Sequence, residues 1–452
     1  MLPDHEAPAP VPQPSAISTT SRKTLCVSVG ALVVSLPFMD LEVFQILGKS
    51  IVLPYVVLIP VALALVLERQ ALQTHLRADT PLPFLVAWVI IAACSAGVAF
   101  LRSQDAGVLA ANVTQVVNIA YMVVHYVVIG AALRMHSNRD FSRVRDIFVW
   151  TACAGAALSV YQVGSVVFGW PYAEWLRTSN LYYKANTLNW IGGGSWIAWP
   201  RAFGSAPEPT FWAGYLAIGL CFALVRLVET FRVRFAVEAG AIVVGLLLTF
   251  SRAAAPPVAA AIIVWALARS PRRQWIVPAI VGATLWISVW PAFLDQHRLA
   301  IASDLSAIER VSAQVTGVRM VTDYPLLGVG PGSVASMIDP YLSTIEGNAG
   351  IGFSRLYSFV LIVIVTTGVI GTILFALFLL ELGRRQYFAV TGRVPGELRT
   401  LALSSLVAYA FILIYWIGSP AYNMSFLWFA LAFGSAVNAR PLSNEDEWPV
   451  SV

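Results

Sequence analysis

Long apolar runs are the feature that most limits what this chain can fold into. A helix needs about 20 apolar residues to cross a hydrocarbon core of roughly 30 Å, and about twelve runs approach that length. They lie near residues 24–46, 51–67, 82–100, 112–133, 147–168, 209–226, 233–250, 253–268, 275–293, 355–380, 400–417 and 420–438. Because a bilayer core offers no water to bond the backbone, such runs must be helices. The sequence therefore predicts an all-α integral membrane protein with about twelve transmembrane helices.

The composition excludes several classes of protein. Hydrophobic residues make up 58% of the chain and charged residues only 12%, whereas soluble proteins carry roughly 25% charged residues. A cytosolic enzyme and a disordered chain are both excluded. The net charge of +5 comes from short basic clusters between apolar runs, which is a topology signal and not a nucleic-acid site.

The basic clusters also predict an orientation. With a cytoplasmic N-terminus and twelve spans, most of the 29 Lys and Arg residues fall on the cytoplasmic side, as the positive-inside rule requires. We therefore expect a polytopic domain at 24–440 between two cytoplasmic tails, a disordered one at 1–23 and a short one at 441–452. Breaks at 251–252 and 418–420 are expected to be tight hairpins at one membrane face.

Two connections are long enough to have a function of their own. They cover residues 169–208 and 294–354 and lie outside the cytoplasm in this topology. The first is rich in aromatic residues, among them Trp190, Trp196 and Trp199. These side chains form either an interfacial aromatic belt or flat platforms for sugar rings.

The same two segments carry arginines beside carboxylates. Arg201 and Glu208 flank a Gly/Pro-rich turn just before an apolar run, where they either form an ion pair or belong to a site. Arg252 lies between two apolar runs and either reaches the headgroups or binds an anion. In the second segment Arg310 and Arg319 are nine residues apart, on roughly opposite faces of a helix, and Asp323 follows.

A glycine run after Asp323 contains Gly328, Gly330 and Gly332. No Gly-Lys-Ser/Thr follows, so the run is not a Walker loop. It forms either a tight turn or a set of backbone N–H groups that bind phosphate. The long segments contain no Asp-x-Asp pair, and a metal that held a diphosphate would need carboxylates. We expect no metal and no cofactor, with arginines as the anion clamp.

Together these features fit one kind of ligand. Aromatic faces suit sugars, arginines suit a diphosphate, and a helical bundle suits a long lipid tail. A lipid-linked sugar diphosphate has all three parts.

Four motifs resemble one family of membrane proteins. Residues 249–254, TFSRAA, are similar to the segment TFSRGA of the O-antigen ligase and Wzy polymerase superfamily. Arg310 followed by MVTDYPLLGVGPG at 320–332 resembles that family's large-loop motif. Arg319 and Gly330 fit the Arg-x10-Gly spacing of the polymerases, and RAFGSAPEP at 201–209 resembles the family's R-x-x-G-x-x-x-x-P approach to a membrane helix.

This resemblance implies a metal-independent, inverting glycosyltransferase of the bacterial inner membrane. Such enzymes transfer glycans from undecaprenyl diphosphate to an acceptor hydroxyl at the periplasmic face, and arginines matching Arg201, Arg252 and Arg310 would bind the diphosphate. Arg319 is a further candidate for this role. Glu208 is the first candidate for the base that deprotonates the acceptor, and Asp323 the second.

The chain departs from the ligase pattern at one place. Ligases usually carry a His-Asn pair after the large-loop motif, whereas the matching region here reads Glu346-Gly347-Asn348. We therefore expect a polymerase of surface-polysaccharide repeat units, with a chain-length regulator and a flippase as further partners. The alternatives are a ligase that transfers finished glycan to lipid A core or protein, and a transporter of lipid-linked glycan.

Overall fold

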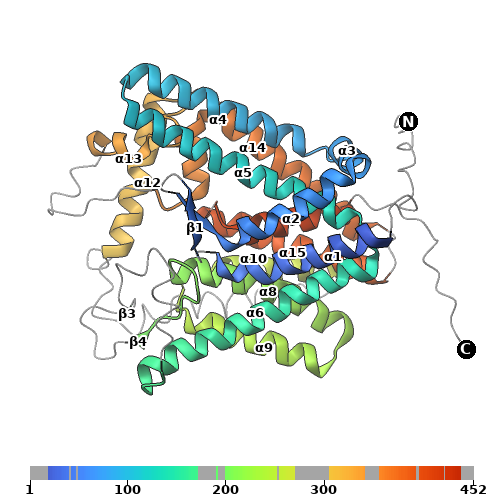
Figure 1. Cartoon of the computed structure of the whole chain (residues 1–452). Helices are drawn as coiled ribbons and strands as arrows, with labels where there is room; N and C mark the ends of the chain where they lie inside the picture. The colour runs from blue at the N-terminus through green and yellow to red at the C-terminus, as the bar shows by residue number, and fades with distance from the viewer. Residues whose placement is uncertain are drawn as a thin grey trace, which may run out of the picture.

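A computed structural model shows a bundle of helices whose connections gather at its two ends (Figure 1). It describes residues 19–39, 42–46, 49–171, 190–191, 199–251, 254–269, 305–341, 356–392, 396–421 and 423–438. The helices are α1 (Thr19–Ser35), η2 (Leu36–Phe38), α2 (Leu53–Leu67), α3 (Arg69–Ala78), α4 (Leu82–Ser103), α5 (Ala106–Arg134), α6 (Asn138–Val167), α8 (Pro209–Thr230), α9 (Val233–Leu248), α10 (Ala255–Arg269), α12 (Leu305–Asp323), α13 (Val334–Met337), η7 (Asp339–Tyr341), α14 (Phe359–Thr391), α15 (Gly396–Gly418) and α16 (Ser425–Asn438).

The predicted helical character is confirmed, and two short hairpins interrupt it. Strand β1 (Glu42–Ile46) pairs antiparallel with β2 (Lys49–Val52), and β3 (Trp190–Ile191) pairs with β4 (Trp199–Pro200). The run predicted at 24–46 was too long, because α1 ends at Ser35. Pro37 follows in η2, and its missing N–H cannot continue a helix. At the other end, α1 begins at Thr19 and so takes in the last residues of the tail predicted at 1–23.

The predicted number of spans is not confirmed. Among the described residues, six helices are long and apolar enough to cross a membrane: α4, α5, α6, α8, α14 and α15. The number is seven if α2 and α3, which meet at 97°, form one bent span. Several other predicted runs form shorter helices, such as α16 with 14 residues and α10 with 15. The run at 275–293 lies outside the described residues.

Aromatic side chains fill the centre of the bundle. Trp212 of α8, Trp416 of α15 and Trp428 of α16 are all almost fully buried in one large apolar core. Helix α15 packs against α8, α10, α14 and α16, so the α15–α16 hairpin forms as predicted. The predicted α9–α10 hairpin does not form a packed pair, because α9 packs on α6 and α8 while α10 packs on α15.

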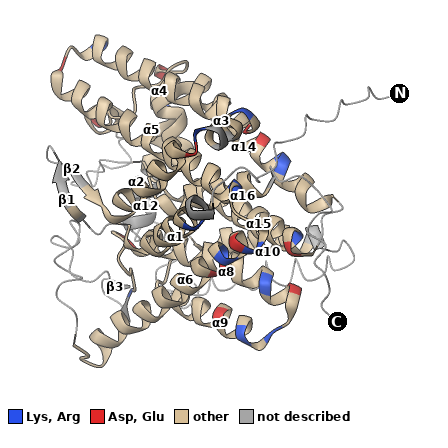
Figure 2. Cartoon of the chain, turned by 45° about the vertical axis from the view of Figure 1, so that its right-hand side comes forward, with Lys and Arg blue, Asp and Glu red and all other residues tan. Residues whose placement is uncertain are grey.

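Buried ion pairs mark one end of the bundle, which we call the charged end. Asp79, before α4, lies 3.9 Å from Arg134 at the end of α5 and accepts a 2.9 Å hydrogen bond from Ser435 of α16. Arg226 at the end of α8 lies 3.3 Å from both Asp146 of α6 and Glu238 of α9. In Figure 2 most of the coloured charged positions gather toward this end.

The opposite end, the loop end, carries both motif-rich segments. It includes residues 201–208 before α8, which we call the Arg201 turn, and residues 325–333 after α12, which we call the glycine loop. The Arg201 turn lies at the ends of α8 and α9 remote from the Arg226 ion pairs. The glycine loop lies at the α4–α5 connection, remote from Asp79 and Arg134. Helices α12 and α13 and strands β3 and β4 lie at this end in Figure 1.

Candidate functional site

The Arg201 turn connects two helix ends that are far apart in the sequence. The Arg201 Nε donates a 3.1 Å hydrogen bond to the Thr249 carbonyl, and the Ala202 N–H donates to Leu248 O at 2.9 Å. Thr249 is the C-cap of α9, and Phe250 takes a left-handed φ of 46°. A guanidinium at a helix C-terminus also interacts favourably with the negative end of the helix dipole. Arg201 is thereby held beside the segment that leads to Arg252.

Glu208 lies at the other end of the same turn. It is the N-cap residue of α8, followed by Pro209, and its carbonyl accepts the N–H groups of Phe211 and Trp212. Its side chain makes no cap hydrogen bond and is partly exposed. A helix N-terminus stabilises negative charge, so the fold offers a carboxylate here within the same short turn as Arg201.

The polar side chain of Gln162 holds the middle of the Arg201 turn. Its Nε2 donates to Gly204 O at 2.7 Å, and its Oε1 accepts from the N–H groups of Phe203 at 3.1 Å and Gly204 at 2.8 Å. Gly204 has a φ of +57°, and a Cβ there would clash with the Trp212 ring. Gln162 was not singled out in the sequence, although a glutamine in an apolar helix is itself a sign of a polar role.

The glycine loop is inserted into a break in α14. Gly368 interrupts that helix with φ 65° and ψ −169°, a combination open only to glycine. The Val329 N–H donates to Val365 O at 2.9 Å and the Val369 N–H donates to Pro325 O at 2.8 Å. The loop therefore binds backbone groups that the broken helix leaves unpaired, as burial in a membrane protein requires.

The three motif glycines allow the backbone of the glycine loop to lie close against α5 and α14. A Cβ at Gly328 would clash with the Val365 carbonyl, and one at Gly332 would clash with the backbone of Ala111 in α5. Gly328 and Gly330 also have φ of 71° and 99°, which L side chains rarely adopt. Asn112 of α5 fixes the loop, because it donates to Ser333 Oγ at 2.7 Å and accepts from the Gly332 N–H at 2.9 Å.

The loop amides are already bonded within the protein. The N–H groups of residues 328, 329, 330 and 333 donate to backbone carbonyls, and that of Gly332 donates to Asn112. Pro331 has no N–H. Of the two interpretations of the glycine run, the structure therefore favours the tight turn over a phosphate-binding loop.

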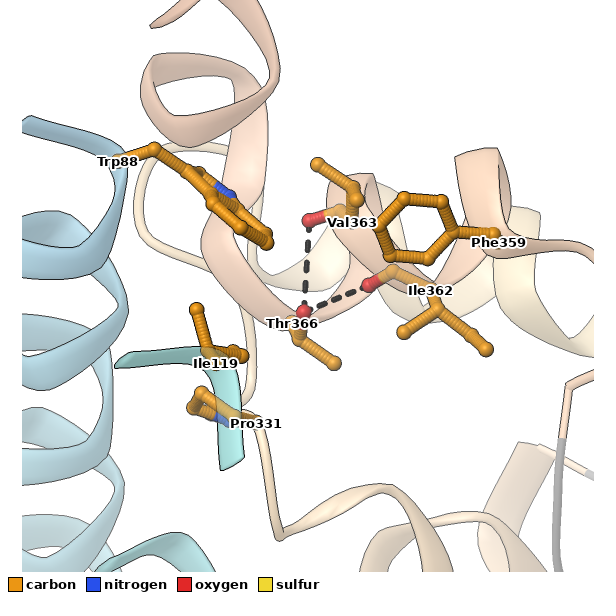
Figure 3. Close-up of a pocket in the computed structure, with 7 residues that line it drawn as sticks. All are labelled: Trp88, Ile119, Pro331, Phe359, Ile362, Val363 and Thr366. Carbon is orange, nitrogen blue, oxygen red and sulfur yellow. Dashed lines mark hydrogen bonds between the residues drawn. The ribbon is translucent and has the colours of Figure 1, made fainter. Parts of the chain in front are cut away.

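A small cleft lies beside this loop, between α4, α5 and α14 (Figure 3). Its lining is apolar except for Thr366 and the indole of Trp88, and it includes Ile119, Pro331, Phe359, Ile362 and Val363. The Thr366 hydroxyl donates to Ile362 O at 2.6 Å. None of these side chains is charged, and the cleft has room for no more than a water-sized group.

Helix α12 carries the other candidate residues. Arg319 and Asp323 lie exposed in its last turns, and the Tyr341 hydroxyl donates to the Asp323 carboxylate at 2.7 Å. Burial, followed by this contact, raises the pKa of the Tyr341 phenol. The backbone of Arg310 lies in the same helix, as expected, and its side chain lies outside the described part. Helix α12 packs on α14 and η7, so Arg319 and Asp323 belong to a group separate from the Arg201 turn.

Arg102 is another residue that the sequence did not single out. It lies in the last turn of α4, and its Nη1 donates to Gly328 O at 3.3 Å. Its guanidinium lies 4.6 Å from the ring centroid of Tyr324.

Of the remaining predicted site residues, Arg252 and Trp196 lie outside the described residues. Trp190 and Trp199 are described only as backbone in β3 and β4, so their predicted contact with sugar remains a prediction.

Among the described residues no group of three or more His, Cys, Asp or Glu side chains is placed to hold a metal ion. The described loop end presents arginines and a few carboxylates. Such a set can bind an anion and accept a proton.

Comparison with known families supports the motifs. Residues 239–376 match the family model described as O-antigen ligase. This range contains the TFSRAA segment, α12, the glycine loop and the break in α14, and it begins after the Arg201 turn. Comparison with curated proteins gives no match. The match covers one segment of the chain, which is similar to the O-antigen ligase family, and it supports the resemblance that the motifs indicate.

Proposed function

We propose that this protein polymerises undecaprenyl-diphosphate-linked repeat units of a surface polysaccharide at the periplasmic face of the bacterial inner membrane. The observation that carries the proposal is the hydrogen bond from Arg201 to Thr249. It joins two of the motifs, 48 residues apart, at the end of the bundle remote from the basic clusters. By the positive-inside rule, the charged end faces the cytoplasm and the loop end the periplasm.

A diphosphate is a good leaving group, so it needs neutralisation of its charge more than protonation. The acceptor hydroxyl oxygen attacks the anomeric carbon of the donor from the face opposite the diphosphate, which inverts that centre. The bond from this carbon to the diphosphate oxygen breaks, and the electron pair leaves with undecaprenyl diphosphate. In this proposal Arg252, Arg310 and Arg319, or alternatively Arg201, stabilise the charge that develops on the leaving group.

The proton of the acceptor hydroxyl needs a base. Glu208 is our first candidate, because it lies in the same short turn as Arg201 and at a helix N-terminus. Asp323 is the second candidate, and its carboxylate accepts a hydrogen bond from the Tyr341 hydroxyl. Trp190, Trp196 and Trp199 are proposed to pack against sugar rings.

A ligase on the same fold is the alternative, since the matched family model is described as O-antigen ligase. The missing histidine near Asn348 favours the polymerase. A transporter of lipid-linked glycan has less support, because the Arg201 turn and the glycine loop, which both carry motifs, lie at the same end of the bundle.

The deciding experiment is the length of glycan on undecaprenyl diphosphate in a strain that lacks this gene, with the wild-type gene restored as the control. Accumulated single repeats would show that joining is blocked and would support the polymerase. Accumulated long chains would show that polymerisation works and transfer fails, which would identify a ligase. Lipid-linked glycan that stays on the cytoplasmic face would indicate a transporter.

A further inference from the structure

We propose that Gln162 is a positioning residue, which sets the placement of Arg201 and Glu208 toward the substrate without contacting it. This inference rests on the proposed function, because it assigns those two residues to the reaction. Gln162 lies in the last turns of α6, is only 3% exposed, and belongs to neither of the motif-rich segments.

The need for such a residue follows from where the Arg201 turn lies. Ala202 and Ala206 are completely buried and Phe203 is 5% exposed, although none of them is in a helix or strand. Irregular backbone within a membrane protein is tolerated only where its polar groups are bonded inside the protein. Gln162 meets this need, because one amide group binds three backbone groups of the turn.

Further hydrogen bonds hold the Arg201 turn in a single position. The Ala206 N–H closes the turn on Phe203 O at 2.9 Å, and the Ser205 hydroxyl donates to Pro37 O. The indole N–H of Trp212 donates to Ser159 Oγ at 2.9 Å, one turn before Gln162 on the same helix. Gly204 lies against the Trp212 ring, so α6 holds the turn from its backbone side.

These bonds place the two functional side chains at opposite ends of a fixed segment. Gln162 holds residues 203 and 204, Arg201 lies two residues before them, and Glu208 lies four residues after them. A shift of the turn by one hydrogen-bond position would move both side chains relative to Thr249 and to the end of α9. Displacements of about 1 Å in a reacting group can cost about 100-fold in rate.

Gln162→Met tests the proposal, because methionine keeps the length of the side chain and removes all three hydrogen bonds. Gln162→Glu keeps acceptor oxygens for the two N–H groups and loses the donor to Gly204 O. Gln386→Met is the matched control. Gln386 is fully buried in α14, and neither of its amide atoms has a hydrogen-bond partner among the described residues.

Rates are measured with purified full-length protein in nanodiscs, well below its unfolding temperature, on lipid-linked glycan isolated from the strain that lacks the gene. We expect about a 100-fold lower turnover for Gln162→Met at saturating donor, an intermediate value for Gln162→Glu, and wild-type turnover for Gln386→Met. The KM for donor is expected to change much less than turnover. Turnover is calculated per folded molecule, because loss of folded protein would also lower the apparent turnover at constant KM.

A double substitution separates positioning from general structure. If Gln162 acts through Arg201, Gln162→Met costs much less in an Arg201→Lys background than in the wild type, since coupled residues are not additive. Independent, multiplicative losses would overturn the proposal, as would wild-type turnover in both Gln162 variants. If Gln162→Met does not fold, Gln162→Glu carries the same cycle. Full activity of Arg201→Ala would instead refute the proposed function.

Discussion

At the scale of single residues, the loop end uses the charges of helix termini. Arg201 lies at the C-terminus of α9 and Glu208 at the N-terminus of α8, so each charge meets the helix dipole with the favourable sign. Such interactions contribute about 0.3–1 kcal/mol at exposed sites, too little to hold the fold together. Their effect is to hold one cation and one carboxylate in fixed places at the loop end of the bundle.

The arginines give the first prediction at this scale. We expect Arg252→Ala and Arg310→Ala each to abolish polymer while protein levels stay unchanged, because the leaving diphosphate loses its cationic partner. Arg252→Lys is also expected to be poor, since lysine lacks the planar fork that binds phosphate oxygens in pairs. Polymer is measured by gel analysis of cells that carry each variant, with Arg143→Ala at the charged end as the control. Normal polymer from both alanine variants would refute the anion clamp.

The glycines act at the same scale through backbone conformation. Gly368 has a backbone conformation that other residues rarely reach, and a Cβ there would clash with the Leu326 carbonyl. The sequence shows this glycine only as one more residue of an apolar run. Its role is visible only when the glycine loop is seen to fill the space beside it.

At the scale of elements, α14 and the glycine loop form one unit. The helix has lost regular backbone hydrogen bonds around Gly368, and the loop, packed against α4 and α5, replaces them. Because of these hydrogen bonds, the position of α14 depends on the position of the glycine loop. Movement of α12 and the glycine loop would therefore be transmitted to α14.

Asn112 tests this coupling. We expect Asn112→Ala to destabilise the protein by about 1–3 kcal/mol, because the Gly332 N–H and the Ser333 hydroxyl lose a buried partner. Hydrogen exchange measured by mass spectrometry should show faster exchange of residues 328–333 in this variant. Asn118→Ala is the control, since within the described part of the chain the Asn118 amide makes a single long hydrogen bond of 3.4 Å, to Gln115 on its own helix. Equal exchange in the two variants would contradict the role of Asn112.

The sequence largely predicted which segments are helices, but it did not predict where those helices begin and end. Apolar runs identify helices because the backbone must bond to itself in a bilayer. Helix α3 escaped notice because its sequence, RQALQTHLRA, is mostly polar. The end of α1 was placed too late, since Pro37 follows an apolar run that continues past it.

At the scale of the whole molecule, the bundle is stabilised at one end and presents its motifs at the other. The ion pairs of Asp79 with Arg134 and of Arg226 with Asp146 and Glu238 join α4, α5, α6, α8 and α9. The sequence placed these basic residues together on one side through their positions between apolar runs. It did not show which carboxylate each one meets.

Removal of the buried carboxylate tests this organisation. We expect Asp79→Ala to destabilise the protein by about 3–5 kcal/mol, because it leaves the buried Arg134 without its carboxylate partner. Arg143→Ala should cost about 0–1 kcal/mol, since Arg143 is 57% exposed in its pair with Asp140. Thermal unfolding in detergent measures both. Similar losses in the two variants would show that the Asp79 contacts do not stabilise the charged end.

The sequence by itself determined the helical class of the fold, the resemblance to one family and the residue types of the candidate site. These follow from apolar run length and from short motifs, which are local properties of the chain. Only the tertiary structure joined Arg201 to Thr249, seated the glycine loop in the break of α14, and placed Gln162 beneath the Arg201 turn. The hydrogen bonds that decide these features join Arg201 to Thr249, Val329 to Val365, and Gln162 to Gly204, pairs that are distant in the sequence. No local pattern specifies such partners, because they are chosen by which buried backbone groups the packed helices leave unpaired.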